Sequence, residues 1–158
     1  MKIILASDHV GFTMKEKMTG FIKNMGHQIA DVGTFSQEKA NYPVYGRKAA
    51  DKLAKGEADR AILICGTGFG MALAANSVRG VRCVNCTDPY TAQLSRQHNN
   101  ANALALGARV LGIELAKMIV ETWLNAKFDA EDGRHAKRVD MLIAMEDNPD
   151  PGTYEVTI

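Results

Sequence analysis

Long apolar runs, cysteine and proline are scarce in this 158-residue sequence, and neither sign of charge predominates. No stretch of 18 residues is continuously apolar, so we expect no membrane-spanning helix. Three cysteines and four prolines exclude a disulfide-stapled miniprotein and a collagen-like chain. Lys and Arg number 19 and Asp and Glu 18, so the net charge of +1 provides no overall field for nucleic acid or an anionic membrane. A charged residue, Asp8, comes too early for a signal peptide, and we expect a cytoplasmic protein.

The length and composition predict one globular domain. Hydrophobic residues make up 46% of the chain and charged residues 23%, and a domain typically takes about 150 residues. We place the domain at residues 1–147. The polar, proline-containing segment 148–158 is expected to form a C-terminal tail outside the core.

Short apolar runs alternate with amphipathic helical patterns along the chain. The predicted strands are residues 3–6, 27–32, 60–65, 82–86 and 102–106. The predicted helices are residues 12–25, 44–55, 71–78, one opening at Asp88-Pro89, 112–126 and 134–146. This alternation predicts an α/β fold: a three-layer α/β/α, Rossmann-like sandwich around a five-stranded parallel sheet. The order of the central strands cannot be read from the pattern.

Residues that follow strands are the first candidates for chemistry, because ligands of such sheets bind at the carboxyl ends of the strands. Asp8 and His9 follow the first predicted strand, and Cys65 ends the third. His98 and Asn99 precede the fifth. We expect most of these side chains to converge on one edge of the sheet.

Cys65 opens a glycine-rich loop, Gly66-Thr67-Gly68-Phe69-Gly70, that leads into a predicted helix. Backbone N–H groups and the positive end of a helix dipole both favour a thiolate there, which suits a base or a nucleophile. The loop also suits an anion or a developing oxyanion. Two alternatives stay open: a small buried core cysteine, and a tight turn for close helix–sheet packing.

Each of the remaining polar residues, taken alone, is weaker evidence for a functional site than Cys65 and its loop. A loop histidine such as His9 or His98 suits proton transfer near neutral pH, yet is commonly only solvated. Arg134 and Arg138 share one helical face, where a phosphate would offset their mutual repulsion, and Arg109 follows the fifth strand. On these residues alone, an ordinary solvated face balanced by neighbouring acids is the better explanation of the pair.

Two further groups are interpreted as packing residues. Cys83 and Cys86 are three apart, so in a strand they point to opposite faces, and no second ligand pair accompanies them for zinc. The apolar stripe in the helix 112–126 is expected to lie in the core: Leu115, Met118, Ile119 and Trp123.

Taken together, these segments make the sequence resemble the ribose-5-phosphate isomerase type B family, which includes galactose-6-phosphate isomerase subunits and allose-6-phosphate isomerase. The matching segments are SDHVGF at 7–12, DVGT at 31–34, YP at 42–43, ICGTGFG at 64–70, AAN at 74–76, GVR at 80–82, SRQHN at 95–99, LGAR at 106–109 and GRHAKR at 133–138.

The resemblance implies a metal-independent aldose–ketose isomerase that converts a sugar phosphate through an enediolate, with no cofactor. Cys65 matches the base that moves a proton between carbons 1 and 2, and His98 matches the residue that opens the sugar ring. Asp8 is implied to share the ring opening, and Thr67 to contribute its hydroxyl. One branch of the family uses a glutamate near the position of Met71 instead, so the thiol branch fits this chain.

Binding roles follow from the same resemblance. The substrate-binding residues it implies are Asp8, His9, Gly66, Thr67, Gly68, Phe69, Gly70 and Asn99. The phosphate-binding residues it implies are His9, Arg109, Arg134 and Arg138. The family builds its site across a dimer interface, so we expect a homodimer or a dimer of dimers in which Cys65 and His98 of one pocket come from different chains.

Of three candidate functions, the sequence favours the first, and the other two stay open as alternatives. The first is interconversion of ribose 5-phosphate and ribulose 5-phosphate, in the pentose phosphate pathway. The second is isomerisation of a hexose 6-phosphate, either allose or galactose, because pocket length cannot be read from sequence. The third is a non-catalytic phosphate-binding module on the same sheet architecture; such a module needs neither Cys65 nor His98.

Overall fold

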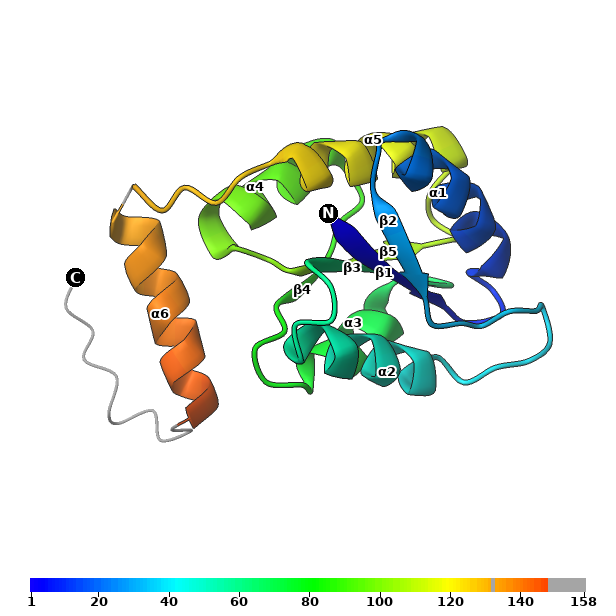
Figure 1. Ribbon diagram of the computed structural model, residues 1–158, viewed down its shortest axis with the longest axis horizontal. Coiled ribbons are helices and arrows are strands. Elements are labelled where there is room, and N and C mark those ends of the chain that lie inside the picture. The colour runs from blue at the N-terminus through cyan, green and yellow to red at the C-terminus, as the bar shows by residue number, and fades with distance from the viewer. Residues whose placement is uncertain (132, 148–158) are drawn as a thin grey trace.

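The computed structural model describes residues 1–131 and 133–147 and forms a five-stranded, wholly parallel sheet covered by helices on both faces (Figure 1). The strands are β1 (Lys2–Ser7), β2 (Gln28–Asp31), β3 (Arg60–Cys65), β4 (Cys83–Asn85) and β5 (Ala103–Gly107). The helices are α1 (Phe12–Asn24), α2 (Tyr42–Ala54), α3 (Phe69–Asn76), α4 (Pro89–Asn99), α5 (Ile113–Asn125) and α6 (Gly133–Asp147). The three-layer α/β/α prediction is confirmed. The predicted tail, 148–158, lies outside the described residues, and within them no helix is both long and apolar enough to span a bilayer.

Two apolar clusters, one on each face of the sheet, form the core. The first joins alternate residues of β1, β3 and β5 to α1, α4 and α5, and the second joins the intervening residues to α2 and α3. This arrangement follows from strands that are apolar on both faces, as strands of a parallel sheet must be when helices cover both sides. Cys86 lies in the first cluster and Cys83 in the second, which confirms that both are packing residues on opposite faces.

The strand order is β2-β1-β3-β5-β4. From β1 the chain crosses through α1 to β2 on one side, whereas β3 lies on the other side of β1. The direction of winding therefore reverses between β1 and β3. A crevice at the carboxyl ends of the two strands beside such a reversal is the usual ligand site of an open α/β sheet.

Two sequence-based expectations need correction, the start of α2 and the buried face of α5. Helix α2 begins at Tyr42 rather than Val44, with Pro43 in its first turn, where a missing N–H costs nothing. In α5, Leu115 and Met118 are 39% and 57% exposed, because the buried face instead runs through Ala116, Ile119, Val120 and Trp123.

Helix α6 extends away from the sheet and packs against α4 (Figure 1). Its inner contact is a stack of the His98 and His135 rings, with centroids 4.1 Å apart and planes within 4° of parallel. Val139, one turn further along α6, is buried. Leu142, Ile143 and Met145 are exposed on the rest of this helix.

Alanine substitutions at two glycines near the start of the chain test how tightly α1 packs on the sheet. A Cβ on Gly11 would lie 2.4 Å from the backbone oxygen of Ile64, whereas a Cβ on Gly20 would meet nothing within 4 Å. We expect Gly11→Ala to destabilise the fold by about 1–3 kcal/mol through overpacking. Gly20→Ala in the same helix should stabilise it by about 1 kcal/mol, because alanine has the higher helix propensity. Urea denaturation measures both, and equal effects of the two substitutions would contradict this packing.

Candidate active site

A cleft of about 420 Å³ opens at the carboxyl edge of the sheet, at the reversal point between β1 and β3. Of the predicted site residues, it brings together Asp8, Cys65, Gly66, Thr67, Gly70 and Arg109. Val10, Tyr42 and Leu73 complete the lining. The expectation that residues at the strand ends meet at one edge of the sheet is therefore met for Asp8, Cys65 and Thr67, and their chemical roles stay predictions.

Cys65 is the last residue of β3 and only 4% exposed, with its thiol at the wall of the cleft. Its Sγ accepts a hydrogen bond from the backbone N–H of Gly68, at 3.2 Å. Gly68 adopts a left-handed conformation, with φ of 85°, and is the N-cap residue immediately before α3. The sulfur thus lies at the N-terminal end of a helix and receives a backbone donor, an environment that stabilises negative charge.

The loop after Cys65 lies flat on the end of β5. A Cβ on Gly107 would be 2.8 Å from the carbonyl oxygen of Thr67, so this approach requires glycine in β5. Asn85 donates its side-chain N–H to the same oxygen at 3.1 Å. The side chain of Thr67 is exposed at the cleft, whereas that of Phe69 is 63% exposed and does not line it.

Arg109, two residues after the end of β5, contacts the loop that follows Cys65. Its backbone N–H donates to the carbonyl of Gly66 at 3.0 Å, and Ala108 donates to the carbonyl of Cys65 at 2.8 Å. The Arg109 side chain runs beside Gly66, 3.7 Å from where a Cβ there would be. One guanidinium is therefore held beside the thiol-bearing loop, where it can bind an anion.

Asp8 and His9 are fixed by different parts of the chain. One carboxylate oxygen of Asp8 accepts hydrogen bonds from the backbone N–H groups of Val10 and Gly11, each at 2.9 Å. The Nδ1 atom of His9 lies 3.2 Å from the backbone nitrogen and 3.1 Å from the oxygen of Ala40. Asp8 is therefore held by its own turn, and His9 by the loop that connects β2 to α2.

Tyr42 is a cleft residue that sequence reasoning missed as a site residue. Its ring lies over Gly70, so closely that a Cβ on Gly70 would be 2.6 Å from a ring carbon. The signal was present: the Tyr42-Pro43 pair starts a helix, and it belongs to the segments that carry the family resemblance.

The second group of predicted residues, His98 and Asn99, lies at the opposite edge of the sheet from Cys65, so these two do not join the strand-end candidates that converge on the cleft. Both residues are in the last turn of α4, which runs antiparallel to the strands. Just beyond, Asn102 donates its backbone N–H to Arg82 and accepts from Ala61, next to the first residues of β4 and β3. Five residue steps of β3, about 16 Å, separate this edge from Cys65.

Helix α6 brings basic residues to this amino edge. His135 stacks on His98, and Nη2 of Arg134 lies 3.3 Å from Nε2 of His135. Arg138 is exposed one turn further along the helix. His98, Asn99, Arg134 and Arg138 therefore form a second polar cluster, far from the cleft of the same chain.

The other two cysteines offer no alternative centre. Burial raises the pKa of Cys83 to about 12, and burial also raises the pKa of Cys86. Both thiols are therefore protonated at neutral pH. Across residues 1–131 and 133–147, no group of three or more His, Cys, Asp or Glu side chains is arranged to hold a metal ion.

Comparison with known proteins agrees with this geometry. Residues 3–142 match the family model described as Ribose/Galactose Isomerase. The chain is 50% identical to ribose-5-phosphate isomerase B of Escherichia coli over 145 residues, covering 92% of this chain and 96% of that protein. It is 42% identical to D-erythrulose-4-phosphate isomerase 2 of Mycolicibacterium smegmatis, covering 92% and 97%. The solved structure of ribose-5-phosphate isomerase B from Clostridium thermocellum superposes with a TM-score of 0.91 at 47% identity, over 95% of this chain and all of that one.

The fold and the cleft thus define a sugar-phosphate isomerase. The chain belongs to the ribose/galactose isomerase family, as the resemblance implied.

The environments of the three cysteines lead to a labelling prediction. Iodoacetamide at neutral pH is expected to modify Cys65 first, because its sulfur lies at the wall of the cleft and receives a backbone donor, whereas Cys83 and Cys86 lie in the apolar clusters of the core and are protonated. Peptide mapping by mass spectrometry identifies the labelled residue. Earlier labelling of Cys86 than of Cys65 in the folded protein would contradict the assignment of the cleft.

Proposed function

We propose that this chain interconverts ribose 5-phosphate and ribulose 5-phosphate through an enediolate, with Cys65 as the base. The observation that carries the proposal is the Cys65 thiol at the cleft wall, with the Gly68 N–H on its sulfur and the start of α3 beside it. The thiolate takes the proton from carbon 2 of the open aldose and returns it to carbon 1 of the enediolate, while a proton moves from oxygen 2 to oxygen 1. Proton abstraction next to a carbonyl needs a positioned base and donors for the developing oxyanion.

Substrate binding in this proposal uses both polar clusters. Asp8, His9 and Asn99 hydrogen-bond the sugar, and the loop Gly66–Gly70, including the backbone at Phe69 and the hydroxyl of Thr67, holds the enediolate oxygens. Arg109, Arg134 and Arg138, together with His9, bind the phosphate, so that binding at the non-reacting end orients the reacting carbons.

The distance between the clusters supports a site shared between two chains. His98, the proposed ring-opening residue, and Cys65 lie at opposite edges of one sheet, so a single chain lacks half of the machinery. A twofold dimer that places the amino edge of one chain against the cleft of its partner supplies both halves twice. We propose a homodimer, alone or paired into a tetramer.

The choice of substrate in this proposal rests on the named relatives. The family description includes galactose, and a relative that is 42% identical is named for erythrulose 4-phosphate. The 50% identity to a ribose-5-phosphate isomerase favours the pentose. An allose or galactose 6-phosphate remains the alternative substrate.

An isomerisation assay with four sugar phosphates, in the presence and absence of EDTA, tests both parts. We expect fastest turnover with ribose 5-phosphate, compared with erythrulose 4-phosphate, allose 6-phosphate and galactose 6-phosphate, and no effect of EDTA. Cys65→Ala should lower kcat by at least about 10²–10⁴-fold, the usual contribution of a general base, while substrate binding measured by calorimetry persists. Preference for another sugar would change the substrate but keep the mechanism, and a Cys65→Ala protein with normal kcat would rule out the proposed base.

A further inference from the structure

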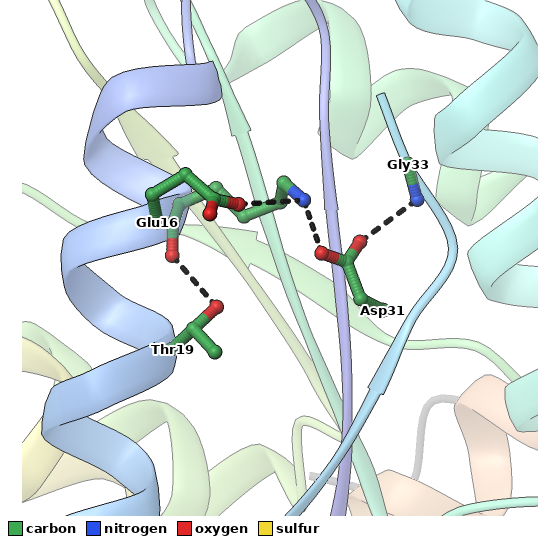
Figure 2. Close-up of polar contacts among 5 residues, drawn as sticks. Glu16, Thr19, Asp31 and Gly33 are labelled. Atoms are coloured by element: carbon green, nitrogen blue, oxygen red, sulfur yellow. Dashed lines mark hydrogen bonds and ion pairs between the residues drawn. The ribbon is translucent and has the colours of Figure 1, made fainter. Parts of the chain in front are cut away.

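A buried ion pair outside the cleft joins α1 to the end of β2 (Figure 2). The side chain of Lys15 is 0% exposed, and its ammonium group donates to a carboxylate oxygen of Asp31, whose side chain is 25% exposed. Glu16, at 3.3 Å, is a second and more exposed partner. The ammonium also lies 5.2 Å from the ring centroid of Phe35 and 5.7 Å from that of Phe12.

Stability alone does not account for a lysine at this position. Taking two charges out of water often costs as much free energy as their attraction returns, so apolar residues of similar size usually serve a core as well. The same helix face buries Met14, Met18 and Ile22. A long apolar side chain at position 15 would continue that face, so the ion pair is better explained by what it holds in place.

The contacts of Asp31 lead directly to the active-site turn. Its other carboxylate oxygen accepts from the backbone N–H of Gly33 at 2.9 Å. The carbonyl of Gly33 accepts from the N–H of Ser7, and the N–H of Thr34 donates to the carbonyl of Ser7, each at 2.7 Å. Ser7 ends β1 and immediately precedes Asp8.

The same loop returns to the site at its other end. Ala40 contacts Nδ1 of His9 through both its backbone nitrogen and its oxygen. Asn41 then precedes α2, whose first residue, Tyr42, lines the cleft. The segment 33–41 is thus hydrogen-bonded to β1 at its start, contacts His9 near its end and leads directly into Tyr42.

We propose that Lys15 and Asp31 are positioning residues that set the β2–α2 loop and, through Ala40, the ring of His9; this inference rests on the proposed function of the cleft. Neither residue lines the cleft or touches Cys65. Asp8 is held by its own turn. Loss of the pair therefore weakens substrate binding through His9 and leaves proton transfer at Cys65 largely intact.

The test compares Lys15→Met and the double variant Lys15→Met/Asp31→Asn with the wild type. In the double variant both charges are removed, while the amide oxygen of the new side chain still accepts from Gly33. For both variants we expect KM for ribose 5-phosphate to rise roughly tenfold and kcat to change less than about twofold, since uniform binding is lost and the reacting geometry is kept. Hydrogen exchange at the amides of Thr34 and Ala40 should become faster.

Two controls separate positioning from general destabilisation. Ile22→Val trims the buried face of the same helix without touching the ion pair, and Glu16→Gln removes the exposed partner. Both should leave KM and the two loop amides unchanged, even where Ile22→Val lowers the melting temperature. A KM increase in Ile22→Val equal to that in Lys15→Met would overturn the proposal.

The two readouts also distinguish this proposal from the proposed function. If the wild type turns over no sugar phosphate, the proposed function fails, and the exchange rates at Thr34 and Ala40 still decide whether the pair holds the loop. If the wild type is active and the Lys15→Met protein shows an unchanged KM or unchanged loop exchange, the positioning role is wrong.

Discussion

The parallel register of β1, β3 and β5 determines where the cleft forms. Ser7 lies opposite Ile64, and Cys65 opposite Gly107, so the three strands end together at one edge. The turn after β1 and the glycine loop after β3 then meet at the reversal point, because the helices that follow these strands, α1 and α3, cover opposite faces of the sheet. Close packing of these loops leaves no room for a Cβ at Gly11 or Gly107. The cleft is a product of this register, not of any single loop.

Much of the fold could be predicted from the sequence because its signals are local. Apolar runs of strand length and helical periodicity located every strand and helix, and glycines marked their ends. The strand order could not be predicted, because it depends on pairings between segments far apart in the chain. The exposure of Leu115 and Met118 was missed for a related reason: an apolar stripe indicates a buried face, but the partner decides which adjacent residues it covers.

The site residues likewise divide into those with a local sequence signal and those whose position depends on the fold. Asp8, Cys65, Thr67 and Arg109 line one cleft because they end or follow strands, and strand ends of a parallel sheet lie together. His98 lies at the opposite edge because it precedes a strand, at the end of a helix that returns the chain to the amino side. The burial of Lys15 gave no sequence signal, since only the fold brings Asp31 and Phe35 around it.

Because the two polar clusters lie at opposite edges of the sheet, the proposed mechanism needs two chains for each site. A complementation experiment tests this requirement. Cys65→Ala and His98→Ala proteins are unfolded and refolded together, so that mixed dimers form. If each site takes Cys65 from one chain and His98 from the other, every mixed dimer has one intact site, and random mixing restores about a quarter of wild-type activity. Activity of the mixture no higher than that of either variant alone, with mixed dimers present by native mass spectrometry, would contradict a shared site.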